Sequence, residues 1–385
     1  MSTPAAALWI GTYPTAGAAP GSGEGIWRVG IAPDGRFTGA ALTAPVAAPS
    51  FLALDPSGRT LVAVTEAEPG TISTFRVSDD GALAPAGSVL SGGASPCHVV
   101  ATETSAWVAN YGDGVAALAP LGPDGEPGAP RTYPHTGSGP VLDRQEGAHA
   151  HFVHVWGDRV LVADLGTDEL RTYPLDGSGP AEGAVAAVLP PGTGPRHLVE
   201  LADGTILVAG ELDCRLHVLV PAGPGRLDHV GSAAITTRTL PDGAAGYPSH
   251  ITVAGDLVHV GVRGPDVLSV LRVRAARAGA PGAASGNLPD DTLSEKPAGT
   301  APAPASGPGR GPQEAGHLTI ENVADVDLGA GAWPRHHAVL GDGAVVVVAA
   351  QNADELIAVR LDRATGKGEI TDRLELPVPA CVLVA

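Results

Sequence analysis

The chain has 385 residues, of which 44% are hydrophobic and 17% charged, a globular composition. Its formal net charge of −18 excludes nucleic acid and anionic membrane surfaces as expected partners. Three cysteines do not suggest a disulfide framework, and the chain has neither a signal-peptide pattern nor an apolar run of about 18 residues. We therefore expect a cytoplasmic protein without a membrane span.

A short pattern recurs along the chain: a proline, any residue, often a histidine, and then an apolar strand. Seven copies occur, at residues 48–55, 95–102, 148–155, 194–201, 247–254, 333–340 and 378–385. In the third copy, we align His149 with the prolines of the others. A repeat in the middle forties is the size of one four-stranded propeller blade.

One interval between copies is much longer than the others because it contains residues 274–316, a segment rich in Ala, Pro and Gly. Such a composition cannot bury enough apolar area to offset the entropy of ordering. We expect a flexible surface loop here, inserted into a single domain that spans residues 1–385.

A second apolar segment follows each copy after a short turn, at residues 60–66, 106–111, 159–166, 205–212, 257–264 and 344–352. Residues 7–13 supply the seventh, which would pair with the last copy so that the N- and C-terminal strands share one blade. The sequence predicts an all-β fold, a seven-bladed β-propeller. Two β-sandwiches are the alternative, but they do not explain the regular spacing.

Polar residues gather where these strands begin and end. The histidine position holds Phe51, His98, His151, His197, His250, His336 and Cys381, and the position before it holds Ser50, Cys97, Ala150, Arg196, Ser249, Arg335 and Ala380. The second strands end on Glu66, Asn110, Asp164, Glu211, Arg263 and Gln351. Because the first strand of each blade lines the central channel, both sets should meet at one mouth.

This combination of side chains suits the hydrolysis of a cyclic ester that carries an anionic group. Imidazole or carboxylate can activate water, and Arg196, Arg263 and Arg335 can bind an anion or an oxyanion. Structural alternatives remain open. The ring histidines could bond a neighbouring blade's backbone or form a metal site, Arg196 could simply pair with Glu211, and Asp164 could serve its turn.

Several segments resemble the lactonase family of seven-bladed propellers, which includes bacterial 6-phosphogluconolactonase and fungal carboxy-cis,cis-muconate cyclase. The matching segments include GTYP, PSFLALDPSGRTLVAVTE, RQEGAHAHF, VADLGTDEL, GPRHL, GEL, VRGPD and AAQNADEL, in the family's order. The resemblance implies that the catalytic residues are His151, Arg196, Glu211 and Arg263, and that the reaction uses no metal and no cofactor.

The expected activity is therefore a lactonase that opens 6-phospho-glucono-1,5-lactone in the pentose phosphate pathway, with His151 or Glu211 activating water. Further substrate contacts are expected from His149, His98, His197, His250, Arg335 and Gln351. The alternatives are an enzyme for muconate-type lactones and a propeller that only binds another molecule. A small anionic lactone is the expected partner, and a monomer or weak homo-oligomer the expected state.

Overall fold

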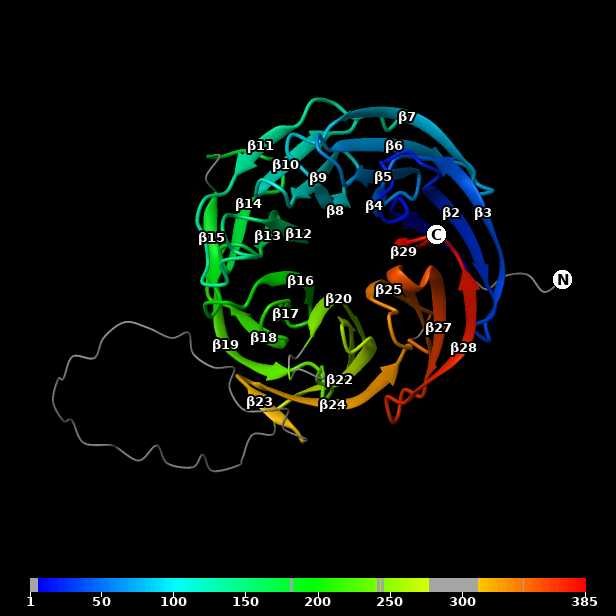
Figure 1. The fold of residues 1–385 in the computed structure, drawn as a ribbon. Helices are drawn as coiled ribbons and strands as arrows, with labels where there is room; N and C mark the ends of the chain where they lie inside the picture. The colour runs from blue at the N-terminus through cyan, green and yellow to red at the C-terminus, as the bar shows by residue number, and fades with distance from the viewer. Residues whose placement is uncertain (1–5, 181–182, 241–242, 244–245, 277–310, 342) are drawn as a thin grey trace, which may run out of the picture.

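The computed structural model describes residues 6–180, 183–240, 243, 246–276, 311–341 and 343–385. Within these residues seven antiparallel sheets stand around a central axis (Figure 1). The predicted seven-bladed β-propeller is thus confirmed. None of the helical segments described has the length and apolar character needed to cross a membrane.

In each blade the strands run in chain order from the axis outward, with two exceptions. The blade at the chain ends begins with the C-terminal strand, followed by the first three strands of the chain, and in one other blade β23 (Gln313–Ala315) lies outside β24 (Leu318–Asp327). The innermost strands are β4 (Pro49–Leu54), β8 (Pro96–Ala101), β12 (Ala150–Trp156), β16 (Pro195–Glu200), β20 (Tyr247–Ala254), β25 (Pro334–Leu340) and β29 (Pro379–Val384). The second strands are β5 (Thr60–Thr65), β9 (Ser105–Asn110), β13 (Arg159–Asp164), β17 (Ile206–Gly210), β21 (Leu257–Arg263), β26 (Val345–Ala350) and β1 (Ala6–Thr12).

The outer half of each blade has the same plan. The third strands are β6 (Thr71–Val77), β10 (Val115–Pro120), β14 (Glu169–Pro174), β18 (Arg215–Pro221), β22 (Val267–Ala275), β27 (Glu355–Leu361) and β2 (Gly25–Ile31). The fourth strands are β7 (Leu83–Leu90), β11 (Arg131–Pro134), β15 (Ala184–Val188), β19 (Leu227–Ala234), β24 (Leu318–Asp327), β28 (Gly368–Glu375) and β3 (Phe37–Pro45). A 3-10 turn, η1 (Gln351–Ala353), precedes β27.

The two ends of the chain close the ring, as predicted. The N-terminal strand β1 pairs with β2 on one side and with the C-terminal strand β29 on the other, where Leu8 faces Val384 and Ile10 faces Val382. The N-terminal strand is therefore paired on both of its edges, and β29 lines the channel as the innermost strand does in every other blade.

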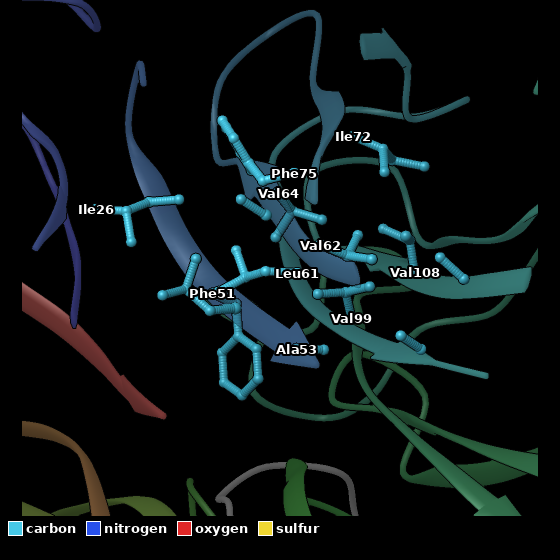
Figure 2. Close-up of a cluster of buried hydrophobic side chains, with 14 of the residues drawn as sticks. Ile26, Phe51, Ala53, Leu61, Val62, Val64, Ile72, Phe75, Val99 and Val108 are labelled. Atoms are coloured by element: carbon cyan, nitrogen blue, oxygen red, sulfur yellow. The ribbon is translucent and has the colours of Figure 1, made fainter. Parts of the chain in front are cut away.

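The core lies between neighbouring blades, which explains why the interior positions of the second strands are mostly apolar. In β5, the side chains from Leu61 to Val64 alternate between the two faces of the sheet, and all are fully buried. Figure 2 shows these residues packed with Ile26 of β2 on one side and Val99 of β8 on the other. A sheet covered on both faces favours a continuous apolar run.

A β-bulge near the start of each inner strand changes one part of the predicted alignment. Ala150 pairs with Asp164 and Phe152 with Ala163, just as Pro195 pairs with Gly210 and His197 with Ala209. Ala150 therefore takes the proline position in the third blade, and the assignment of His149 to it was wrong. His151 is the structural counterpart of Arg196, because the bulged residue is skipped in the pairing.

The boundaries of the predicted loop at residues 274–316 also need correction. Arg274 pairs with Thr319 and Ala275 with Leu318, so the ladder between β22 and β24 continues into this segment. At the other end, β23 (Gln313–Ala315) adds a fifth strand to the same sheet. The backbone hydrogen bonds of these strands order both ends. The expected flexibility of residues 277–310 concerns a part of the chain that lies outside the described residues.

Candidate active site

Two rows of residues meet at one mouth of the channel. The first row consists of the bulged residues of the inner strands: Ser50, Cys97, His151, Arg196, Ser249, Arg335 and Ala380. The second row lies next to it, where the second strands end: Tyr13, Glu66, Tyr111, Leu165, Glu211, Arg263 and Gln351. Bulges often re-aim a side chain beside a functional site.

Glu211 is the centre of the largest charged cluster in these rows. Its Oε2 lies 2.7 Å from Arg263 Nη2 and 2.8 Å from Arg196 Nε, and its Oε1 lies 2.5 Å from Arg144 Nη2. Arg196 and Glu211 are each only 2% exposed. Three of the four predicted catalytic residues, Arg196, Glu211 and Arg263, are therefore in direct contact, and one carboxylate serves three guanidinium groups.

Backbone carbonyl groups fix the two buried guanidinium groups of this cluster. Arg196 donates from Nη1 to Ser249 O, and Arg263 donates from Nε to Tyr247 O at 3.1 Å. The Arg263 guanidinium also lies 5.4 Å from the centre of the Trp333 ring. Both arginines are thus oriented before any ligand arrives, which is what stabilisation of a developing negative charge requires.

Burial and mutual repulsion change the acidity of these groups. Burial, together with the Arg263 charge, lowers the pKa of Arg196 to about 9. Burial acts to raise the pKa of Glu211, but the charges of Arg263 and Arg196 outweigh it and hold this pKa well below the usual range. Glu211 is therefore a carboxylate at neutral pH, and both of its oxygens are occupied by guanidinium groups.

His151 joins this cluster from the neighbouring blade as a neutral imidazole. Burial, reinforced by the positive charge of Arg196, lowers its pKa well below the ordinary value, whereas Glu211 acts in the opposite direction. Its Nδ1 lies 3.8 Å from the thiol of Cys97, which also donates to the His151 carbonyl oxygen at 3.4 Å. Burial raises the pKa of Cys97, so this residue is a protonated thiol that holds the bulge of the adjacent strand.

A second polar cluster lies in the same two rows and consists of Arg335, Tyr13 and Glu66. The Tyr13 hydroxyl donates to Glu66 Oε2 and accepts a hydrogen bond of 2.5 Å from Arg335 Nη2. The Arg335 charge lowers the pKa of both Arg196 and Arg263, which places it near the Glu211 cluster. Burial raises the pKa of Tyr13 well above 10, so its hydroxyl keeps its proton.

Six aromatic and imidazole rings fill the channel one residue deeper than the first row. Neighbouring ring centres lie 3.7 to 5.1 Å apart, and the layer consists of Phe51, His98, Phe152, His197, His250 and His336. His98 Nδ1 accepts the backbone N–H of Val153 at 3.2 Å, which is the contact expected of a structural histidine. The layer forms the floor of the site.

Five other residues that the sequence analysis proposed as substrate contacts lie outside the Glu211 cluster. His98, His197 and His250, proposed as substrate contacts, belong to the floor, where Nδ1 of His197 lies 2.8 Å from Nδ1 of His250. His149 lies at the rim, where its Nδ1 donates to Tyr111 O at 2.8 Å. Gln351 occupies the second row.

Asp164 belongs to a turn, as the structural alternative predicted. It accepts a hydrogen bond of 2.6 Å from His135 Nδ1 and further bonds from the backbone N–H groups of His149, Gly166 and Thr167. It therefore fixes the backbone just before His151 and does not line the site. In the described part of the chain, no three His, Cys, Asp or Glu side chains are grouped as metal ligands.

Sequence reasoning did not assign a role to Arg144, Tyr13 or Tyr111. Arg144 and Tyr13 lie in RQEGAHAHF and GTYP, two segments of the family resemblance, and Tyr111 directly follows strand β9. Arg144 and Tyr111 come from loops, where no periodicity shows which way a side chain points. The recurrence of polar residues directly after the second strands could have identified Tyr13 and Tyr111, but it does not apply to Arg144.

Fold and site together define a β-propeller with an arginine-rich, carboxylate-bridged cluster at the mouth of its channel. The family profile described as "Lactonase, 7-bladed beta-propeller" matches residues 7–279. The chain therefore belongs to the lactonase family of seven-bladed β-propellers, as the sequence resemblance implied.

The chain is also similar to individual proteins in sequence or in fold. An uncharacterized protein of Lactococcus lactis (strain IL1403) is 30% identical over 239 residues, which are 60% of this chain and 68% of that protein. A 6-phosphogluconolactonase of Formosa agariphila is 30% identical over 168 residues, covering 40% of this chain and 48% of that one. The periplasmic gluconolactonase of Pseudomonas aeruginosa has a similar fold, with a TM-score of 0.77, 24% identity and 99% of each chain covered.

Proposed function

We propose that this protein hydrolyses an anionic sugar lactone, 6-phospho-glucono-1,5-lactone, to 6-phosphogluconate without a metal ion. The observation that carries the proposal is the charge at the channel mouth. Four guanidinium groups, those of Arg144, Arg196, Arg263 and Arg335, share two carboxylates as ion-pair partners, those of Glu211 and Glu66, although the whole chain has a net charge of −18. Such a local excess of positive charge attracts an anionic substrate.

In this proposal His151 activates the attacking water. Its imidazole is neutral, whereas both oxygens of Glu211 are already engaged by arginines. His151 takes a proton from water as the water oxygen bonds to the lactone carbonyl carbon. Arg196 and Arg263 stabilise the resulting oxyanion. The ring C–O bond then breaks, and the leaving oxygen takes the proton back from the His151 imidazolium.

The remaining groups of the site hold the sugar. The Tyr13 hydroxyl donates its hydrogen to Glu66 and accepts one bond from Arg335, so its remaining lone pair can accept a hydrogen bond from a hydroxyl group of the sugar. Glu211 keeps Arg196 and Arg263 in place through its ion pairs. The ring layer with Phe51 and Phe152 closes the channel beneath the substrate.

We also propose that the protein acts in the cytoplasm, in the pentose phosphate pathway, as a monomer or weak homo-oligomer. The cysteines support the location, because Cys97 and Cys381 are buried free thiols, a usage typical of reducing compartments.

The proposal is tested by comparing lactones that share a reaction but differ in charge. We expect kcat/KM in the presence of EDTA to be highest for 6-phospho-glucono-1,5-lactone and at least about 10-fold lower for glucono-1,5-lactone, which lacks the phosphate. Spontaneous hydrolysis is subtracted in each case. A higher kcat/KM for a muconate-type lactone would show that such a lactone, and not the sugar phosphate, is the preferred substrate. Loss of the rate in EDTA would contradict the metal-free mechanism.

A further inference from the structure

Arg144 differs from the other arginines of the Glu211 cluster in where it comes from and how exposed it is. It lies on the connection between β11 and β12, residues 135–149, which is the longest of the connections that lead to an inner strand. Its side chain is 33% exposed, whereas those of Arg196 and Arg263 are 2% and 8% exposed. Arg144 thus reaches over the site from the solvent side.

The backbone that carries Arg144 is firmly anchored. The N–H groups of Arg144 and Gln145 both donate to Val141 O, at 2.9 and 2.7 Å. Gln145 is fully buried, and its Nε2 donates to Leu165 O at 2.9 Å and to Asp168 Oδ1 at 2.8 Å. The backbone at Arg144 is therefore fixed, and its partly exposed guanidinium can move only by rotation of the side chain.

Asp168 links this anchor to the strand that carries Arg196. Its carboxylate also accepts the backbone N–H groups of Gly192 at 2.7 Å and Gly194 at 2.8 Å, just before β16. One carboxylate thus fixes the backbone beside Arg144 and the backbone beside Arg196. The backbone segments that carry the two arginines are therefore fixed relative to each other, although they belong to different blades.

The partners of the three arginines show which of them is available to a ligand. Arg196 and Arg263 each donate to a buried backbone carbonyl in addition to contacting Glu211. Arg144 contacts Glu211 Oε1 and the Tyr111 side chain. If Arg144 leaves Glu211, the carboxylate still has both buried arginines. When Arg144 moves away, Glu211 therefore stays paired with two buried guanidinium groups. The partly exposed guanidinium of Arg144 is then free to bind an anion.

We propose that Arg144 determines specificity for anionic lactones by moving from Glu211 to the anionic group of the bound substrate. This inference rests on the proposed lactonase function. A guanidinium binds phosphate or carboxylate through two parallel hydrogen bonds, and in the free protein Glu211 occupies the place of that anion. An uncharged lactone has no anionic group that could replace Glu211 as the partner of Arg144. Arg144 therefore contributes to binding only for substrates with a negative charge.

The test compares Arg144→Gln with wild type on 6-phospho-glucono-1,5-lactone and glucono-1,5-lactone, two substrates that differ only in the phosphate. We expect the ratio of their kcat/KM values to fall about 10- to 100-fold in Arg144→Gln, because a charged hydrogen-bonded contact is lost only with the anionic substrate. Arg144→Lys should recover part of the ratio. Arg360→Gln is the matched control, since Arg360 forms an exposed pair with Glu369 at 3.4 Å and should leave the ratio as in wild type.

Equilibrium binding of the two products separates this proposal from the proposed function. By calorimetry, wild type should bind 6-phosphogluconate more tightly than gluconate, and Arg144→Gln should lose that preference. Equal losses with both lactones, or a preserved preference for 6-phosphogluconate, would overturn the role of Arg144. A protein that hydrolyses neither lactone but shows the Arg144-dependent preference would support the anion site and overturn the lactonase activity instead.

Discussion

Replacing Glu211 by Gln is expected to lower kcat/KM for lactone hydrolysis about 1,000-fold and the free energy of unfolding by about 3 to 5 kcal/mol. The substitution keeps the size of the side chain but removes the one charge that Arg144, Arg196 and Arg263 share. The buried arginines then repel each other without compensation. They also lose the contact that aims them at the lactone carbonyl.

A double variant separates the two effects. In Glu211→Gln/Arg263→Gln, one of the mutually repelling charges is gone, so we expect part of the lost stability to return while activity stays low. Urea unfolding followed by circular dichroism measures the first quantity, and initial rates measure the second. A Glu211→Gln variant with wild-type stability, or with more than a tenth of wild-type kcat/KM, would show that this carboxylate does not organise the site.

Acidification is expected to destabilise the fold steeply below pH 6.5. Burial lowers the pKa of six histidines in and around the channel: His98, His151, His197, His250, His336 and His337. In the unfolded chain each of them binds a proton near pH 6.5, whereas in the folded chain it stays neutral. The unfolded state therefore binds more protons as the pH falls, and the stability present above pH 6.5 is lost.

The size of the effect follows from the number of histidines. Each histidine with a lowered pKa reduces the free energy of unfolding by about 1.4 kcal/mol per pH unit below 6.5. Six such histidines together reduce it by up to about 8 kcal/mol between pH 7.5 and 5.5. That is comparable to the whole stability of a typical domain. Urea unfolding at pH 7.5, 6.5, 6.0 and 5.5 measures it. His250→Gln should make the loss of unfolding free energy per pH unit about 1.4 kcal/mol smaller, which is the contribution of one histidine. A free energy of unfolding that stays constant over this range would contradict the neutral ring layer.

The sequence was sufficient to predict the fold because each blade repeats one pattern. Seven copies with nearly equal spacing leave few arrangements, and the pairing of residues 7–13 with the last copy follows from the count. The same regularity brought together Arg196, Glu211 and Arg263, because Arg196 lies at the start of an inner strand and the other two lie at the ends of second strands in the same two adjacent blades. Periodicity predicts such positions well because the backbone of every blade is the same.

The parts that sequence could not supply lie where the pattern breaks. Arg144 comes from a connection without periodicity, so nothing in the sequence shows that it reaches Glu211 on another blade. The bulge moved His151 into the row of Arg196 and placed Phe152 among the floor residues, because the residue that is skipped in pairing cannot be identified from residue types alone. The packing of the histidines into that floor also depends on side-chain directions.

The most direct test of the account is the initial rate of hydrolysis of freshly generated 6-phospho-glucono-1,5-lactone in EDTA, for wild type and Arg196→Ala. Arg196 donates to Ser249 O and contacts Glu211, so it is held at the centre of the proposed oxyanion site. We predict a fast rate in EDTA for wild type and a loss of at least about 100-fold in the variant, with both proteins folded. A wild-type rate no higher than spontaneous hydrolysis, or a variant as fast as wild type, would contradict the account.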